Sequence, residues 1–130
     1  MSCPADPACR PATGNLLPLL HEVRHALARL AAGQSSTVID LRGIPFAPGE
    51  EQQLERLLGR GETRIDIDAL GPTEVLETAV GGVWLVTHRN ADGDIVGRFI
   101  EIGRVPEIVQ TPAADIDDGL SEITRMLANE

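Results

Sequence analysis

Two β-rich segments and the turn between them decide the fold: Val83-Trp84-Leu85-Val86-Thr87-His88-Arg89, the loop Asn90-Ala91-Asp92-Gly93-Asp94, and the run from Ile95 to Ile102. β-Branched and aromatic residues recur in both segments, which is typical of strands. Gly93 can adopt the positive φ that a tight turn requires, so the stretch predicts an antiparallel hairpin. On its first strand Trp84, Val86 and His88 share one face, because alternate residues of a strand point the same way.

Shorter runs upstream extend this hairpin into a sheet. Residues 64–68 alternate isoleucine with charged side chains, which is typical of a strand with one solvated face. Residues 74–80 predict another strand, although residues 74–79 also fit a helical turn. Gly81-Gly82 then marks a tight turn. Residues 37–41 predict a short buried strand, and the sequence leaves its pairing, parallel or antiparallel, open. We expect a four-stranded antiparallel meander with one additional strand.

Three stretches carry the periodicity of helices. Apolar residues between positions 16 and 30 recur at spacings of four and three, Asn15 is a candidate N-cap, and Gly33 ends the segment. Residues 48–58 and 112–127 predict two further helices. The side chains expected to face the sheet are Leu16, Leu20, Val23, Leu27 and Leu30, then Leu54, Leu57 and Leu58, then Ile116, Leu120, Ile123 and Leu127. We therefore expect an α+β fold: a mostly antiparallel sheet of about five strands with three helices packed against it.

Length and composition restrict both organisation and chemistry. The chain has 130 residues, which fits a single domain at residues 16–130 after a flexible, proline-rich tail at residues 1–15. All 11 basic residues are arginine, so Schiff-base chemistry and the lysine of phosphate-binding loops are excluded. A net charge of −9 disfavours nucleic acid and anionic membranes as partners. The sequence shows no spanning apolar run and no secretory signal, so we expect a cytoplasmic protein.

The sequence His21-Glu22-Val23-Arg24-His25 matches the H-E-x-x-H pattern of zinc peptidases. In those enzymes the two histidines, one helical turn apart, bind zinc while the glutamate activates water. A small metal-dependent hydrolase that uses His21, Glu22 and His25 is therefore an alternative function. However, both histidines lie opposite the leucine stripe, and the chain offers no recognisable third ligand beyond His88 or a carboxylate. We favour a solvated or partner-facing histidine pair.

Two other pairs of residues are weaker candidates for a chemical role. Cys3 and Cys9 lack the spacing of a redox or zinc motif, and they leave open a metal or cluster carrier on the tail. Asp66 and Asp68 share one face of a strand, where paired carboxylates could bind a hard cation or transfer protons. Alternating charges on a strand are more typical of a solvated face, which is the interpretation we favour.

Several stretches, taken in order, resemble the HupH or HyaF family of hydrogenase expression/formation proteins, specifically its C-terminal domain. The resemblance extends from about Leu16 to the end of the chain. The stretches that carry it are residues 17–27, 38–42 with Pro45-Phe46, Leu70-Gly71-Pro72, Gly82-Val83-Trp84 with His88-Arg89-Asn90 and Gly93, and 97–101 with Val105-Pro106.

The resemblance implies a non-enzymatic accessory role in the maturation of nickel–iron hydrogenase. It implies a chaperone-like protein that binds the iron–sulfur small subunit precursor before assembly and export, alongside a thioredoxin-like helper, with no catalytic residues, cofactor or metal of its own. The charge of −9 suits a basic client segment, such as a twin-arginine export signal. We expect the partner-binding surface around Trp84, His88 and Arg89 in the hairpin and around His21 and His25 on the first helix. Trp84 is equally consistent with a core plug and an interface hot spot.

Overall fold

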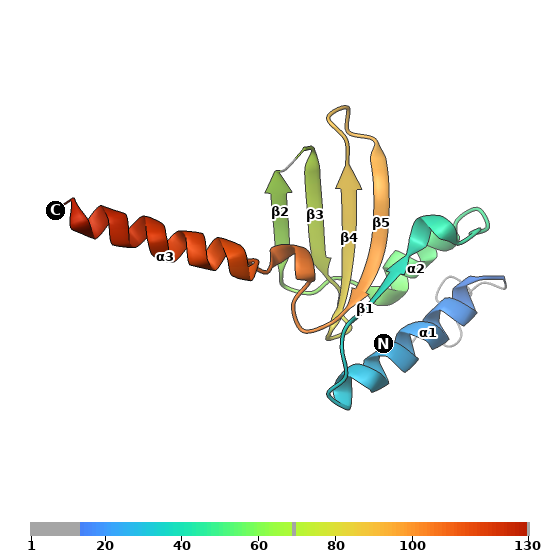
Figure 1. The fold of residues 1–130 in the computed structure, drawn as a ribbon. Coiled ribbons are helices and arrows are strands. Elements are labelled where there is room, and N and C mark those ends of the chain that lie inside the picture. Colours follow the sequence, from blue (N-terminus) through green and yellow to red (C-terminus); the bar gives the residue numbers. More distant parts are fainter. Residues whose placement is uncertain (1–13, 69, 130) are drawn as a thin grey trace.

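A five-stranded antiparallel sheet forms the centre of the computed structural model, which describes residues 14–68 and 70–129 (Figure 1). Its strands, in the spatial order β1-β5-β4-β3-β2, are β1 (Thr37–Asp40), β5 (Ile95–Ile102), β4 (Val83–Arg89), β3 (Pro72–Glu77) and β2 (Arg64–Asp68). Every neighbouring pair is antiparallel, including β1 with β5. The expected meander is confirmed, and the first strand joins it at the β5 edge.

The β4–β5 hairpin forms where the sequence predicts it. Its register places Leu85 opposite Ile100, and a bulge lies between His88 and Arg89. Gly93 adopts a φ of 86°, and the Asn90 side-chain oxygen accepts hydrogen bonds from the backbone N–H groups of Asp92 and Asp94. These local bonds close the turn: the bond from Asp92, two residues ahead, is typical of asparagine in turns, and the bond from Asp94 spans the rest of the loop.

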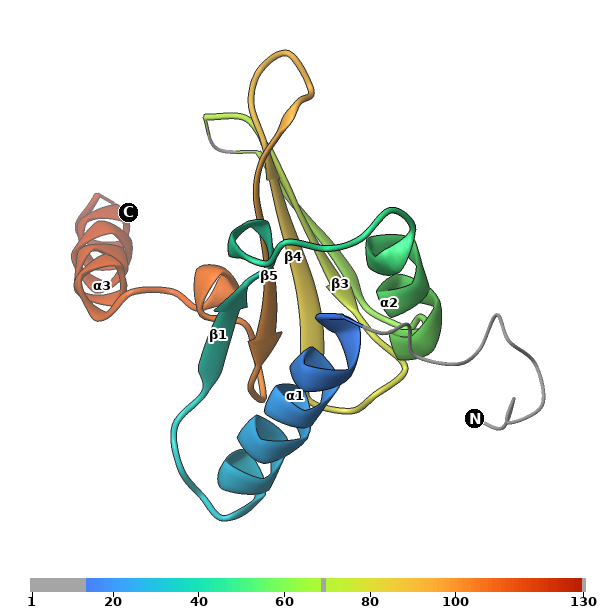
Figure 2. The same cartoon turned by 90° about the vertical axis from the view of Figure 1, so that its right-hand side faces the viewer.

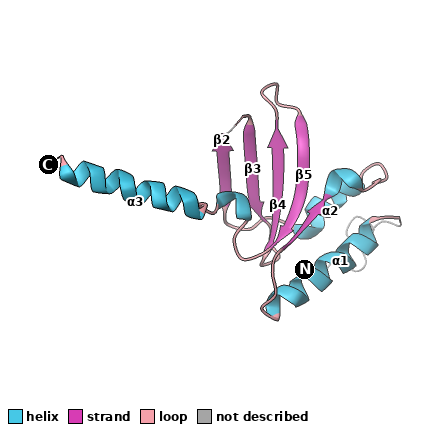
Figure 3. Ribbon diagram, in the orientation of Figure 1, coloured by secondary structure: helices cyan, strands magenta, loops and turns pink. Residues whose placement is uncertain are grey.

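Three α-helices accompany the sheet: α1 (Leu16–Ala31), α2 (Glu50–Leu58) and α3 (Ala113–Ala128) (Figure 3). Two short 3₁₀ helices, η2 (Leu41–Gly43) and η3 (Glu107–Val109), complete the fold. Figure 2 shows the sheet nearly edge-on, with α1 and α2 on one side and η3 and α3 on the other. The α+β class with three helices and five strands is thus confirmed.

The main core lies between the sheet and the two helices α1 and α2. It contains Leu16, Leu19, Val23 and Ala26 from α1, Leu54 and Leu58 from α2, and Leu76, Val83, Leu85, Ile100 and Ile102 from the sheet. The stripe predicted on α1 is partly wrong, because Leu20 and Leu27 are only half-buried whereas Leu19 and Ala26 are buried. Both adjacent stripes of this helix are apolar, so its rotation was decided by packing against the sheet rather than by periodicity.

Two further local predictions are corrected. Asn15 makes no side-chain cap on α1; its amide instead donates to the Pro45 carbonyl at 2.7 Å, which ties the helix start to the loop before α2. The strand expected at residues 74–80 ends at Glu77, because the Thr78 hydroxyl donates to the Val83 and Val80 carbonyls and turns the chain early.

The C-terminal helix forms, but it does not pack on the sheet. Every described residue of α3 is exposed, including the four expected to face inward, Ile116, Leu120, Ile123 and Leu127. In Figure 1 the helix projects beyond the β2 edge of the sheet. The sequence predicts the amphipathic helix but not its partner, since periodicity does not say which surface the apolar stripe meets.

The tail predicted at residues 1–15, with Cys3 and Cys9, lies almost wholly outside the described residues. Among the described residues, no helix combines the length and the apolar character needed to cross a membrane.

Candidate functional site

The sheet has a second apolar face, on the side away from α1 and α2. We call it the open face; the strand registers place on it Val38, Ile65, Ile67, Thr73, Val75, Trp84, Val86, His88, Phe99 and Glu101, with the acidic Asp40 and Glu77 at the ends of β1 and β3. A sheet face that borders water usually carries polar side chains. Here Val75, Trp84 and Val86 form a second buried cluster, flanked by the half-buried Ile65, Ile67 and Phe99. The open face therefore has the composition of a surface that another element covers.

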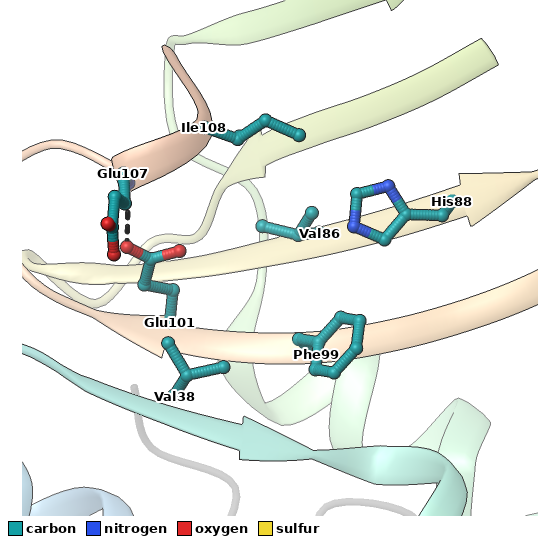
Figure 4. Close-up of a pocket in the computed structure, with 7 residues that line it drawn as sticks. All are labelled: Val38, Val86, His88, Phe99, Glu101, Glu107 and Ile108. Carbon is teal, nitrogen blue, oxygen red and sulfur yellow. Dashed lines mark hydrogen bonds between the residues drawn. The ribbon is translucent and has the colours of Figure 1, made fainter. Parts of the chain in front are cut away.

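A hollow of about 340 Å³ lies on this face, between β1, β5, β4 and η3 (Figure 4). Its lining residues are Val38, Val86, His88, Phe99, Glu101, Glu107 and Ile108. The volume is near the lower end of the range for ligand pockets, and the mixture of apolar walls with a few polar groups is typical of binding sites.

His88 lies at one end of the hollow and is held in place by two neighbours. Its Nδ1 lies 2.8 Å from the Thr73 hydroxyl across the β3–β4 pair. Its ring meets the Phe99 ring edge-on, with centroids 5.7 Å apart and an interplanar angle of 68°. Such an edge-to-face pair is a favourable aromatic geometry. The imidazole is thus fixed as part of the wall, with a hydroxyl rather than a carboxylate as its partner.

Glu101 lies at the other end of the hollow and is 6% exposed. Its Oε2 accepts a hydrogen bond of 2.8 Å from the backbone N–H of Glu107, the first residue of η3. A carboxylate at this position satisfies a backbone donor that the helix start leaves unpaired. Glu101 therefore holds η3 against the open face, and this contact forms the closed end of the hollow.

Trp84 is buried next to the hollow and is not an exposed contact residue. Its side chain packs with Val75 and Val86, the residue is 8% exposed, and its indole N–H donates to the Gly103 carbonyl at 3.1 Å. The buried indole and its satisfied N–H favour the core interpretation of this residue within the single chain.

The other residues singled out in the sequence lie apart from the hollow. Arg89 is exposed at the end of β4, and its guanidinium donates to the Gly93 carbonyl at 2.9 Å, within the hairpin turn. His21 and His25 are exposed on α1, which packs on the opposite face of the sheet. The structure therefore brings Trp84 and His88 together on the open face and leaves the two α1 histidines on a separate surface.

Within the described residues, the structure places no further metal ligands beside the histidines and carboxylates singled out in the sequence. Within residues 14–68 and 70–129, no group of three or more His, Cys, Asp or Glu side chains is placed to hold a metal ion. Asp66 instead pairs with Arg64 at 3.3 Å, and the same arginine reaches Glu74 at 2.8 Å, all on the surface. These contacts favour the solvated-face interpretation of β2.

Four residues that line the hollow are not predicted from the sequence: Val38, Glu101, Glu107 and Ile108. No clear sequence pattern marks these four residues as one site, because they come from three different elements that only strand pairing and η3 bring together. The alternation of β5 does place Phe99 and Glu101 on one face, but only the register with β4 shows that it is the face of Trp84 and His88.

These features define a small α+β domain with a hollowed, apolar sheet face and a projecting helix. Residues 14–129 match the family described as HupH hydrogenase expression protein, C-terminal conserved region. The chain belongs to this family, as its sequence resemblance indicated.

Individual relatives agree with this assignment. The chain is 34% identical over 97 residues to hydrogenase expression/formation protein HoxQ of Azotobacter vinelandii, an alignment that covers 75% of this chain and 34% of the relative. It is 27% identical over 104 residues to HupH of Rhizobium leguminosarum bv. viciae, with 80% of this chain and 37% of the relative covered. The chain thus spans about a third of the length of these curated relatives.

A solved structure shares the fold. Hydrogenase expression protein HupH from Thiobacillus denitrificans superposes with a TM-score of 0.83 and 36% sequence identity, covering 91% of this chain and 98% of that chain. The unit described here therefore corresponds to nearly the whole of that solved chain.

Proposed function

We propose that this protein is a non-enzymatic accessory factor in hydrogenase maturation. In this proposal it binds the precursor of the iron–sulfur small subunit in the cytoplasm, before the subunit is assembled and exported, and a thioredoxin-like helper acts beside it. The family membership and the printed names of its relatives support a maturation role.

The single observation that carries the binding proposal is the open face with its hollow. A subunit that has not yet met its partner exposes apolar segments, and such segments bind to apolar surfaces of matching shape. The hollow offers Val38, Val86 and Phe99 for apolar contact, with His88 and Glu101 at its ends. We place the client contact here, with Trp84 buried next to the hollow and Arg89 exposed further along β4, and we treat the His21–His25 surface as a separate candidate.

The test begins with a pull-down from hydrogenase-producing cells, with the tagged protein as bait and mass spectrometry as the readout. The proposal expects the small subunit precursor to be recovered and the mature exported form to be absent. Recovery of no hydrogenase component under these conditions would overturn the proposal.

Two matched variants locate the contact. Val38→Asp places a charge on the open face, whereas Val96→Asp places the same charge on a similarly exposed valine of β5, two residues before the helix-side Arg98. We expect Val38→Asp to weaken precursor binding at least tenfold and Val96→Asp to leave it within about twofold, since an uncompensated charge in an apolar contact costs several times the thermal energy. A double variant, His21→Ala with His25→Ala, tests the α1 surface in the same assay.

A separate experiment tests whether acidity selects the client segment. With a net charge of −9, the protein should bind a basic export signal in a salt-dependent manner. Deleting the signal peptide from the precursor should then weaken binding and flatten its salt dependence. Unchanged affinity after this deletion would exclude the signal peptide as the contact.

A further inference from the structure

Helix α3 carries a continuous apolar stripe that nothing in the described chain covers. Ile116, Leu120, Ile123 and Leu127 follow the 4-3-4 spacing of a narrow packing seam. They are 60%, 65%, 52% and 68% exposed, and Met126 beside them is 52% exposed. Isolated helices of this length are marginal in water, so such a helix gains its stability from packing its apolar side.

The same chain holds a second apolar surface that is only partly covered, the open face of the sheet: η3 packs on part of it, while Val38 is 54% exposed and Ile65, Ile67 and Phe99 are half-buried. With α1 and α2 on one face and apolar residues on both, the sheet has the pattern of a middle layer between two helical layers. The molecule therefore contains both halves of a helix-on-sheet contact, and the two halves do not touch.

The connection between them directs the helix away from its own sheet. Val109 of η3 packs against the open face, and the chain then runs extended through Gln110 and Pro112 into α3. Proline fixes its own φ and holds the preceding residue, Thr111, in extended conformations. As Figures 1 and 2 show, α3 leaves the open side of the sheet and continues past β2 instead of folding back across the face.

The dimensions of the two surfaces match. The stripe from Ile116 to Leu127 is about 16 Å long at 1.5 Å per residue. Four neighbouring strands span about 14 Å at 4.8 Å per spacing, so the stripe can cross β1, β5, β4 and β3.

The area also suffices for a dimer. A large aliphatic side chain holds on the order of 100 Å² of apolar surface, so each stripe exposes roughly 300 Å². A surface that covers a stripe loses about as much accessible area as the stripe does, so two reciprocal contacts would bury roughly 1,200 Å² in total, which is the lower bound for a specific interface.

We propose that a second copy of this chain covers the open face, with α3 of each protomer lying across the sheet of the other. The exchange closes on itself by two-fold symmetry and leaves neither apolar surface exposed, as in other swapped dimers. The exchanged helix also masks the hollow, so the dimer is the resting state of the client surface; this masking rests on the proposed function, whereas the dimer does not.

The first experiment measures the mass of the intact chain in solution by light scattering. We expect twice the monomer mass for the unchanged protein, and monomers for Leu120→Asp on the stripe and Val38→Asp on the open face. Ser121→Asp, one residue off the stripe, and Val96→Asp, at the bulge near the hairpin turn and outside the hollow, should remain dimeric. Circular dichroism shows whether each variant is folded. If Val38→Asp is not folded, Ile108→Asp takes its place.

Each measured mass either supports or overturns the proposed exchange of α3. A monomeric unchanged protein would overturn it, and so would a dimer that survives both test variants. A dimer lost in Leu120→Asp but kept in both Val38→Asp and Ile108→Asp would mean that α3 pairs with α3, which also overturns the exchange onto the sheet.

Masking is tested with the small subunit precursor as the probe. At protein concentrations where the unchanged chain is dimeric, the monomeric Leu120→Asp should bind the precursor at least fivefold more tightly, because no helix has to be displaced. Equal or weaker binding by Leu120→Asp would overturn masking. If neither protein binds the precursor, the proposed function fails while the mass measurements still decide the dimer.

Discussion

Arg98 connects the helix side of the sheet to α2 through two ion pairs. Its guanidinium contacts Glu51 Oε2 at 2.5 Å and Glu55 Oε2 at 2.9 Å, from consecutive turns of the helix. Burial by itself lowers the pKa of Arg98, but the hydrogen bonds that the guanidinium donates to Glu55 and Glu51, together with the charges of these carboxylates, outweigh it and raise that pKa overall. The arginine is thus held charged while it fixes the orientation of α2.

Replacing Arg98 with methionine should lower the free energy of unfolding by about 1 kcal/mol, measured by urea denaturation. The loss is modest because both glutamates are more than a third exposed and regain water when the arginine is removed. Arg64→Met removes the exposed ion pairs of β2 and should cause no measurable change. Equal losses of unfolding free energy in Arg98→Met and Arg64→Met would show that the ion pairs of Arg98 stabilise the fold no more than the exposed ion pairs of Arg64 do.

Trp84 should behave as a core residue. Trp84→Ala should lower the free energy of unfolding by about 3–5 kcal/mol, because it leaves a cavity beside Val75 and Val86. Trp84→Phe should cost about 1–2 kcal/mol, chiefly from the unpaired Gly103 carbonyl. Thermal and urea unfolding both measure these losses, and a Trp84→Ala variant as stable as the unchanged chain would place the indole in an interface instead.

At the scale of the element, α1 shows which of two adjacent apolar stripes faces the core. Leu19→Ala should cost about 2–5 kcal/mol of unfolding free energy, because Leu19 is buried. Leu20→Ala should cost less, since Leu20 is half-buried, and the exposed Leu17 less still. Urea denaturation of the three variants gives the order, and the reverse order of Leu19 and Leu20 would restore the stripe predicted from periodicity.

The two histidines of α1 should not hold stoichiometric zinc. Both lie on the exposed side of the helix, and the described residues place no third ligand beside them. Protein purified without chelators should contain well under one zinc per chain by elemental analysis, and treatment with a chelator should leave its unfolding midpoint unchanged. One zinc per chain that disappears in both His21→Ala and His25→Ala would revive the hydrolase hypothesis.

At the scale of the whole molecule, α3 should contribute nothing to the stability of a single protomer. A chain truncated after Gln110 should unfold within about 0.5 kcal/mol of the monomeric Leu120→Asp variant, because no described residue of α3 is buried. Urea denaturation of both proteins at equal concentration measures the difference. A truncated chain that is several kcal/mol less stable would show that α3 packs on its own sheet in solution.

Local patterns predicted most of the fold because they depend on neighbours in the sequence. The hairpin at residues 83–102 was recognisable from its β-rich segments and from Asn90 and Gly93, whose turn chemistry is local. The alternation in β2 and the 3.6-residue period of the helices were recognisable for the same reason. The site was less accessible: His88 and Trp84 share a strand face, but Val38, Glu101 and Ile108 join them only through pairing across the sheet.

Residue types and their spacing are enough to indicate the helices and strands of this protein, its α+β class, its acidity and its family. Packing in three dimensions selects which stripe of α1 is buried, where β1 joins the sheet, and how η3 and Glu101 close one end of the hollow. It also leaves the apolar stripe of α3 exposed and the open face only partly covered. Periodicity shows that a surface is apolar, whereas the surface that meets it depends on packing in three dimensions, and for α3 we place that surface in a second copy of the chain.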